Sequence, residues 1–206
     1  MKLLCGPSDD RREFVLELPK NKTKIGIFVS GGLDSAILYY LLSLKNKELN
    51  FLHDIIPLTV LRKEGSKNFS KLVVAHVRSS FHQNYLESFI LGNNTLPEPE
   101  QVKSGVLEAR SLGFEVVYTG LIQQLPQHMI GWQPIPYEES NFFKAPFKNL
   151  NKSHIVDLCL QFNQQALFYI THSCATWEIT KCNQCNGCNE RNWGFEQLGI
   201  IDPGTI

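Results

Sequence analysis

The sequence predicts an α/β protein with a Rossmann-like parallel sheet and a small metal-binding element near its C-terminal end. Short apolar segments rich in β-branched residues alternate with segments of helical spacing, a pattern typical of a parallel sheet covered by helices on both faces. A glycine-rich turn joins the most apolar segment directly to a helical one, as in the phosphate-binding turns of such folds. Four closely spaced cysteines indicate the metal-binding element.

Five segments have the composition of strands, because each is short, apolar and rich in β-branched or aromatic residues. In chain order they cover residues 13–18, 24–29, 55–61, 72–77 and 114–119. The first belongs to an N-terminal extension, residues 1–22, that precedes the main fold. The second is nearly continuous in apolar character, as expected of a strand that is buried on both faces of a sheet.

Three segments repeat apolar residues at the spacing of one helix face. These residues are Ile37, Leu41 and Leu44; then Val102, Val106 and Ala109; then Ile155, Cys159 and Phe162. The second helix is expected over 98–112 with Gly113 as its stop signal, and Asn151 is expected to cap the third. Residues 121–148 show no such period and are expected to form a long functional loop.

The composition is that of a globular protein, with 43% hydrophobic and 19% charged residues in a chain of 206. The 20 basic residues balance the 20 acidic ones, so no overall positive field attracts nucleic acid, and direct nucleic-acid binding is not expected. The first residues lack the apolar run of a signal peptide, and no segment has the ~18 consecutive apolar residues of a membrane-spanning helix. These features predict a cytoplasmic protein.

The turn after the strand 24–29 contains the strongest functional signal. Its residues are Ser30, Gly31, Gly32, Leu33, Asp34 and Ser35. Glycines allow backbone N–H groups to approach an anion closely, and the start of a helix adds unpaired donors. The serine hydroxyls can donate to phosphate oxygens, whereas the carboxylate of Asp34 can hold phosphate only through Mg²⁺. The Walker and Rossmann glycine patterns are absent, and the remaining alternative is an ordinary turn with a serine or aspartate helix cap.

The clustered cysteines are Cys174, Cys182, Cys185 and Cys188, and the last three are each separated by two residues. In a reducing compartment this clustering indicates a metal rather than disulfides, and it predicts a tetrahedral Cys₄ zinc site. Three alternatives remain open: a four-iron, four-sulfur cluster, a site in which His172 replaces Cys174, and redox or catalytic thiols. Cys5 and Cys159 stand apart from the cluster and are expected to be buried small residues.

The glycine turn resembles the SGGxDS signature of the PP-loop ATP pyrophosphatases, which cleave ATP between its α and β phosphates and adenylylate a substrate oxygen. Together with the cysteine pattern and Arg191, it resembles one family of that superfamily, the 7-cyano-7-deazaguanine synthases of the queuosine pathway. The segments 171–174, 145–152 and 117–120 also match the family pattern. The resemblance covers roughly residues 24–200.

This resemblance implies conversion of 7-carboxy-7-deazaguanine to the nitrile with ATP, Mg²⁺ and ammonia, in a homodimer that holds Zn²⁺. It also implies that Asp34 and Lys152 act in catalysis, the lysine by neutralising charge that develops on phosphate. The residues expected to bind ATP are Ser30, Gly31, Gly32, Leu33, Asp34, Ser35, Arg78 and Gly120. Residues 1–170 are expected to form the ATP pyrophosphatase domain, and residues 171–206 the zinc-binding element.

Parts of the chain depart from the family pattern. Residues 92–105 contain no arginine where the family has Gly-Arg-Asn, and residues 121–137 contain no carboxylate where the family has an acidic residue. Only about ten residues separate the strands expected over 55–61 and 72–77, fewer than a parallel crossover needs. These departures leave open a related amidoligase with another carboxylate substrate, a tRNA sulfurtransferase, and a zinc-stabilised nucleotide-binding module without catalysis.

Overall fold

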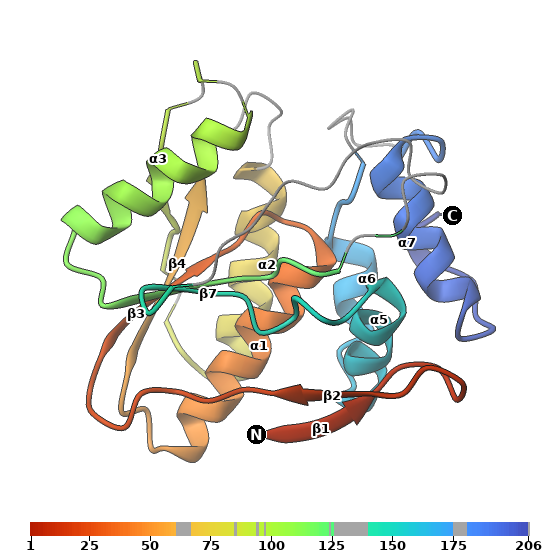
Figure 1. Ribbon diagram of the computed structural model, residues 1–206, viewed down its shortest axis with the longest axis horizontal. Helices are drawn as coiled ribbons and strands as arrows, with labels where there is room; N and C mark the ends of the chain where they lie inside the picture. Colours follow the sequence, from red (N-terminus) through yellow and green to blue (C-terminus); the bar gives the residue numbers. More distant parts are fainter. Residues whose placement is uncertain are drawn as a thin grey trace.

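The computed structural model describes residues 1–60, 67–84, 86–93, 95–96, 98–123, 125, 140–174 and 181–205. Within these residues a sheet of five strands lies at the centre, in the order β5-β4-β3-β6-β7, and every neighbouring pair is parallel (Figure 1). The strands are β3 (Lys24–Phe28), β4 (Asp54–Val60), β5 (Phe89–Leu91), β6 (Val116–Thr119) and β7 (Phe143–Lys144). The α/β fold expected from the sequence is therefore confirmed.

Helices cover both faces of this sheet. They are α1 (Leu33–Glu48), α2 (Lys67–Ser80), α3 (Glu98–Ser111), α5 (Lys152–Gln161), α6 (Ala166–Ile170) and α7 (Asn186–Glu196), with a 3-10 turn η1 (Pro203–Thr205) at the end. Among the described helices, none combines the length and the apolar character that a bilayer crossing requires.

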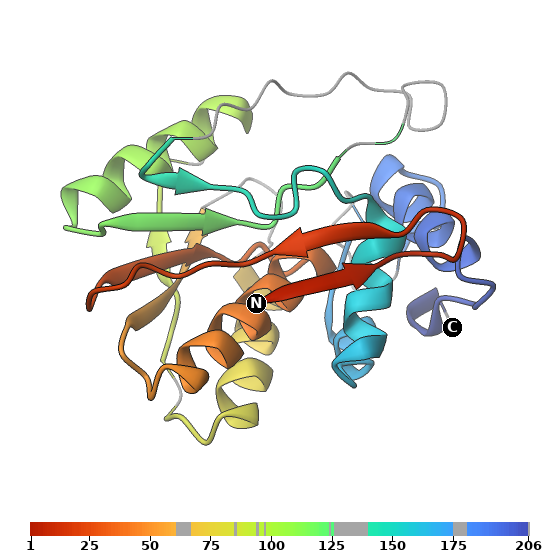
Figure 2. The same ribbon diagram turned by 60° about the horizontal axis from the view of Figure 1, so that its bottom comes forward.

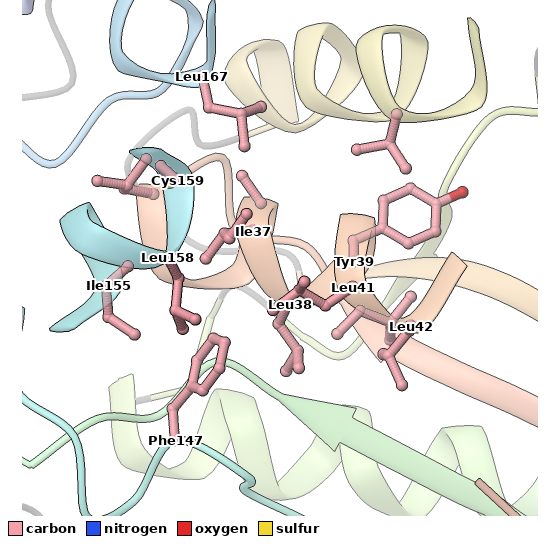
Figure 3. Close-up of a cluster of buried hydrophobic side chains, with 14 of the residues drawn as sticks. Ile37, Leu38, Tyr39, Leu41, Leu42, Phe147, Ile155, Leu158, Cys159 and Leu167 are labelled. Carbon is pink, nitrogen blue, oxygen red and sulfur yellow. The ribbon is translucent and has the colours of Figure 1, made fainter. Parts of the chain in front are cut away.

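Strand β3 supplies side chains to two hydrophobic cores because it is buried on both faces. Ile25 and Ile27 contribute to the larger core beneath α1 and α2, whereas Phe28 contributes to the smaller core beneath α3. Figure 3 shows part of the larger core, to which Leu38 of α1 and Leu158 of α5 both contribute. The helix faces predicted around Ile37 and around Ile155 are both buried in this core.

The strand expected over 72–77 is wrong, because these residues lie inside helix α2. Its buried residues Val73, Val74 and Val77 follow helical spacing, whereas Leu72 is exposed. The β-branched composition of the segment suggested a strand, but packing against α1 outweighs that preference. Helix α2 is thus the crossover that connects β4 to the parallel strand β5, which the sequence did not predict. The ten residues that looked too few for a crossover do not connect two strands.

The N-terminal extension forms a hairpin of its own. Strand β1 (Lys2–Cys5) pairs antiparallel with β2 (Arg12–Val15), and this pair stays separate from the central sheet. The strand expected over 13–18 corresponds to β2, whereas β1 was not expected. The hairpin contacts α5, and Figure 2 shows it crossing in front of that helix. The backbone N–H of Gly6 donates to the carboxylate of Asp157 at 2.8 Å, which fixes the hairpin to α5.

Candidate active site and metal centre

The glycine turn lies between β3 and α1, at the carboxyl end of the sheet, where ligands bind in folds of this kind. Gly31 has φ +88°, and a Cβ at this position would lie 2.6 Å from Cβ of Phe69 in α2, so only glycine fits. The backbone N–H of His172 donates to the carbonyl of Gly31 at 2.9 Å, and the His172 ring stacks on Phe69 with centroids 4.2 Å apart. Two distant parts of the chain, α2 and the segment that contains His172, therefore shape this turn.

The two serines of the turn hold its backbone in place. The hydroxyl of Ser35 accepts from the N–H of Ser30 at 3.2 Å and donates to the carbonyl of Gly32 at 3.1 Å. The N–H of Gly32 in turn donates to the hydroxyl of Ser30 at 3.3 Å. Gly32 is the N-cap of α1 and has no capping side chain, so the first-turn N–H groups of the helix have no acceptor within it. This arrangement can bind an anion such as pyrophosphate.

Gly120, at the end of β6, lies against the start of α1. A Cβ at Gly120 would stand 2.6 Å from the backbone nitrogen of Ser35, which explains why glycine follows the strand. A cavity of about 210 Å³ opens beside this contact. Its lining residues are Phe28, Val29, Ser30, Asp34, Ser35, Val60, Val102, Thr119, Gly120 and Leu121. The polar residues lie on the glycine turn and at the end of β6 (Thr119), and the apolar ones lie on the strands, α3 and the segment after β6, which suits a nucleotide with a phosphate end and a base.

Lys152 is the first residue of α5, and its side chain is only 2% exposed. Its ammonium group donates to both carboxylate oxygens of Asp34, at 2.6 and 2.7 Å, and lies 3.2 Å from a carboxylate oxygen of Glu190 in α7. Burial alone would lower the pKa of Lys152, but the charges of Asp34 and Glu190 outweigh it and raise the pKa. The structure thus brings together Asp34 and Lys152, the two residues predicted to act in catalysis, with a charged lysine.

The helix that presents Lys152 begins with the cap expected from the sequence. The side chain of Asn151 accepts from the N–H of Ser153 at 3.1 Å, and His154 completes a capping box with the backbone of Asn151. This cap fixes the first turn of α5 and therefore the direction in which Lys152 leaves the helix.

Two residues around this site were not predicted from the sequence. The first is Glu190, whose pKa is raised by burial. The charge of Lys152 lowers this pKa in part, and the charge of Asp34 raises it further. Arg12 of the N-terminal hairpin donates to the side chain of Gln123 and to the carbonyl of Asn149, and so connects the hairpin to the chain just before α5. The only sequence signal for Glu190 is its place next to the motif residue Arg191, and Arg12 has none.

The four clustered cysteines converge, as the sequence predicts. Their sulfur atoms all lie within 4.8 Å of one another, and those of Cys174 and Cys185 are 3.9 Å apart. Tetrahedral zinc with Zn–S bonds of about 2.3 Å separates its sulfurs by about 3.8 Å, so the thiols fit this metal. The N–H of Cys182 donates to the sulfur of Cys174 at 3.3 Å, and that of Cys185 to the sulfur of Cys182 at 3.3 Å.

His172 is not part of this cluster, because its backbone and ring serve the glycine turn. Arg191, the arginine of the cysteine motif, has a structural role that the motif alone did not reveal. It is 1% exposed and donates to both carboxylate oxygens of Asp202, at 2.6 and 2.9 Å, and to the hydroxyl of Thr171 at 2.9 Å. These bonds fix α7 to the chain on either side of it.

Arg78 does not join the other residues expected to bind ATP. It lies in the last turn of α2 rather than after a strand, and it donates to the carbonyl of Asn84. With Asp54 it lines a separate cavity at the amino end of β4, whereas the glycine turn is at the carboxyl end of the sheet. Its expected position depended on the strand assigned to 72–77, which is a helix.

The segment 126–139, within the loop expected over 121–148, lies outside the residues that the structure describes.

Comparison with known proteins agrees with this geometry. The family model described as queuosine biosynthesis protein QueC matches residues 126–199, a range that includes Lys152, Glu190 and the four cysteines. The chain is similar to the 7-cyano-7-deazaguanine synthase of Oceanobacillus iheyensis, with 22% identity over 164 residues that cover 73% of this chain and 72% of that protein. It is also similar to the 7-cyano-7-deazaguanine synthase of Campylobacter jejuni, with 38% identity over 61 residues, 30% of this chain and 26% of that protein. The chain is therefore similar to the QueC family of queuosine biosynthesis proteins, whose family model matches residues 126–199.

Proposed function

We propose that this protein is an ATP-dependent ligase that converts 7-carboxy-7-deazaguanine to 7-cyano-7-deazaguanine with ammonia. The observation that carries the proposal is the buried contact between Lys152 and Asp34, within a glycine turn whose helix N-cap has no capping side chain. An acidic group that can bind Mg²⁺ and a lysine that can neutralise phosphate charge are what cleavage of ATP between its α and β phosphates requires. Both similar curated proteins carry the name of this activity.

The residues of the glycine turn, together with Gly120, would bind ATP. The turn is suited to the β and γ phosphates, and the apolar part of the 210 Å³ cavity to the adenine base. Mg²⁺ would be held by Asp34 and would offset the charge of the leaving pyrophosphate. Lys152 would stabilise the negative charge that builds up as the bond between the α and β phosphates breaks.

The reaction itself would proceed in two activations. A carboxylate oxygen of the substrate attacks the α phosphorus of ATP, pyrophosphate leaves, and a carboxyl-adenylate remains. Ammonia attacks its carbonyl carbon, AMP leaves with that oxygen, and an amide forms. The amide oxygen then attacks the α phosphorus of a second ATP, a second pyrophosphate leaves, and loss of AMP and of two protons from nitrogen gives the nitrile.

The cysteine cluster would hold Zn²⁺ as a structural ion, because four cysteine ligands leave no open position for substrate. We assign residues 171–206 to this zinc-binding element and residues 1–170 to the ATP pyrophosphatase domain. We further propose a cytoplasmic homodimer whose substrates are the deazapurine carboxylate and ammonia.

The proposal is tested by incubating the protein with 7-carboxy-7-deazaguanine, ATP, Mg²⁺ and ammonium, and by analysing the products by liquid chromatography and mass spectrometry. We expect AMP, pyrophosphate and the nitrile. Asp34→Asn should abolish all three products, whereas Asp54→Asn, which alters an exposed aspartate at the other end of the sheet, should leave them unchanged. Absence of AMP from the wild-type reaction would refute the proposal.

A related amidoligase with a different carboxylate substrate is the second candidate. The departures from the family pattern favour it, because residues 92–105 lack the arginine and residues 121–137 lack the carboxylate. Release of AMP from ATP with another carboxylate, and none with the deazapurine, would select this candidate over the first.

A further inference from the structure

The ammonium group of Lys152 lies between two carboxylates from different parts of the chain. Asp34 binds it through both oxygens, at 2.6 and 2.7 Å, and Glu190 lies on the other side at 3.2 Å. The side chain of Lys152 is 2% exposed, that of Glu190 18% and that of Asp34 23%. One ammonium group thus lies between two carboxyl groups where little water reaches it, so their mutual interactions are stronger than at the surface.

Helix α7 encloses Lys152 from one side. Glu190 meets the head of the lysine, and Gly194, one turn later, meets its stem. A Cβ at Gly194 would lie 2.5 Å from Cγ and 2.9 Å from Cβ of Lys152, so the helix can approach this closely only with glycine there. The same helix begins at its N-cap Cys185 and carries Cys188 in its first turn. The cysteine cluster therefore fixes the position of the helix that packs against the lysine.

A conflict arises when magnesium and ATP bind. In the structure both oxygens of Asp34 are used by Lys152, but the proposed function requires this carboxylate to bind Mg²⁺. At least one oxygen of Asp34 must then turn from the lysine to the metal, so the buried ammonium loses part of its pairing. A buried ammonium without a partner is strongly unfavourable and tends to lose its proton. Glu190 is the other described acidic group in contact with the lysine, at 3.2 Å, and it is placed to remain the partner of the ammonium when Asp34 binds the metal.

We propose that Glu190 is a positioning residue that keeps the ammonium group of Lys152 charged and directed at the leaving pyrophosphate once Asp34 binds magnesium. Glu190 touches neither ATP nor magnesium in this arrangement and acts through the lysine. The cysteine-bearing element would then complete the ATP site as well as stabilise the fold. The inference rests on the proposed function for the identity of the reacting groups.

The first test compares Glu190→Gln with Glu196→Gln, which removes the same charge from an exposed position on the same helix. Without Glu190, Lys152 should bind Asp34 more tightly and compete with magnesium. We expect the Mg²⁺ concentration for half-maximal activity to rise several-fold and kcat to fall about ten-fold or more, with a smaller change in KM for ATP. Glu196→Gln should match the wild type. Glu190→Asp keeps the charge and should restore part of the loss.

A merely structural role would lower the melting temperature and the zinc content, and would leave the Mg²⁺ dependence of the remaining activity unchanged. A folded Glu190→Gln protein with wild-type zinc content, kcat and Mg²⁺ dependence would overturn the proposal. Should Glu190→Gln fail to fold, Gly194→Ala replaces it. Gly194→Ala pushes on the stem of Lys152 and should also lower kcat more than it raises KM.

A binding measurement separates this inference from the proposed function. Calorimetric titration of the wild type and Glu190→Gln with α,β-methylene-ATP, at several Mg²⁺ concentrations, needs no substrate and no turnover. A higher Mg²⁺ requirement for binding in the variant supports the role of Glu190 even if the deazapurine is not the substrate. An identical requirement refutes that role even if the nitrile is formed.

Discussion

Replacing Gly120 by alanine should damage the phosphate end of the candidate ATP site through the backbone alone. The added Cβ would lie 2.6 Å from the nitrogen of Ser35 and 2.8 Å from both the carbonyl carbon of Asp34 and Cα of Ser35. Ordinary contact begins at 3.4 Å, so the end of β6 and the start of α1 must separate by about 0.8 Å. All three contacted atoms belong to the backbone, so no side-chain rotation can relieve the clash.

Two consequences follow from this separation. Overpacking of this kind costs about 1–3 kcal/mol of unfolding free energy. The shift also moves the first turn of α1, which would present Asp34 and its N–H groups to phosphate, and a displacement near 1 Å can cost about 100-fold in rate. We therefore expect Gly120→Ala to remain folded, but to lose on the order of 100-fold in kcat/KM for ATP.

The assay combines urea denaturation with the rate of AMP formation, and Gly113→Ala is the matched control. A Cβ at Gly113 meets nothing within 4 Å, but this residue has φ +76°, so alanine there should cost about 1 kcal/mol of stability through backbone strain and leave the rate unchanged. A Gly120→Ala protein with wild-type kcat/KM would show that the contact between β6 and α1 does not shape the ATP site.

Three further results are expected. Lys152→Met should reduce AMP formation by about 100-fold or more. The control is Lys148→Met, which replaces an exposed lysine four residues earlier and should leave the rate unchanged. Equal rates in both variants would show that Lys152 has no part in the mechanism. Elemental analysis should find about one zinc per chain and none in Cys182→Ser, which should also melt earlier; iron in place of zinc would contradict the Cys₄ zinc site. Burial raises the pKa of Asp202, but the hydrogen bonds and charge of Arg191 outweigh burial, so the pKa is lowered in the folded protein. The ion pair therefore stabilises the fold above the unfolded pKa of about 4, and this stabilisation is lost as pH falls below that value. Asp202→Asn should thus be about 3–5 kcal/mol less stable at pH 7, and the difference from wild type should shrink at pH 3, as measured by urea denaturation; a difference that does not depend on pH would refute this account.

The parts of the fold that were predictable from sequence depend on local signals. The buried strand β3, the glycine turn and the Asn151 cap of α5 each have a pattern within a few neighbouring residues, and each is confirmed. The segment 72–77 misled because valine favours strands, whereas its burial in a helix depends on α1, which is distant in sequence.

The candidate site likewise contains residues that were predictable from the sequence and residues that were not. The four cysteines were predictable because short spacings place them near one another before any tertiary structure is considered. Glu190 and Arg12 were not, because their roles arise only when α7 and the N-terminal hairpin pack against α5. Arg78 was misplaced for the same reason as its segment, since its position at one end of the sheet depends on the direction in which α2 runs.

The hydrogen bond from His172 to Gly31 has a consequence for synthesis of the chain on the ribosome. The turn and the strand before it emerge early, but the partner that holds the Gly31 carbonyl is made only after most of the chain has been translated. An emerging chain can therefore assemble much of its sheet while the phosphate turn still lacks its final shape. The ability to bind ATP would therefore appear late in translation, at about the time when the cysteine-bearing segment is completed.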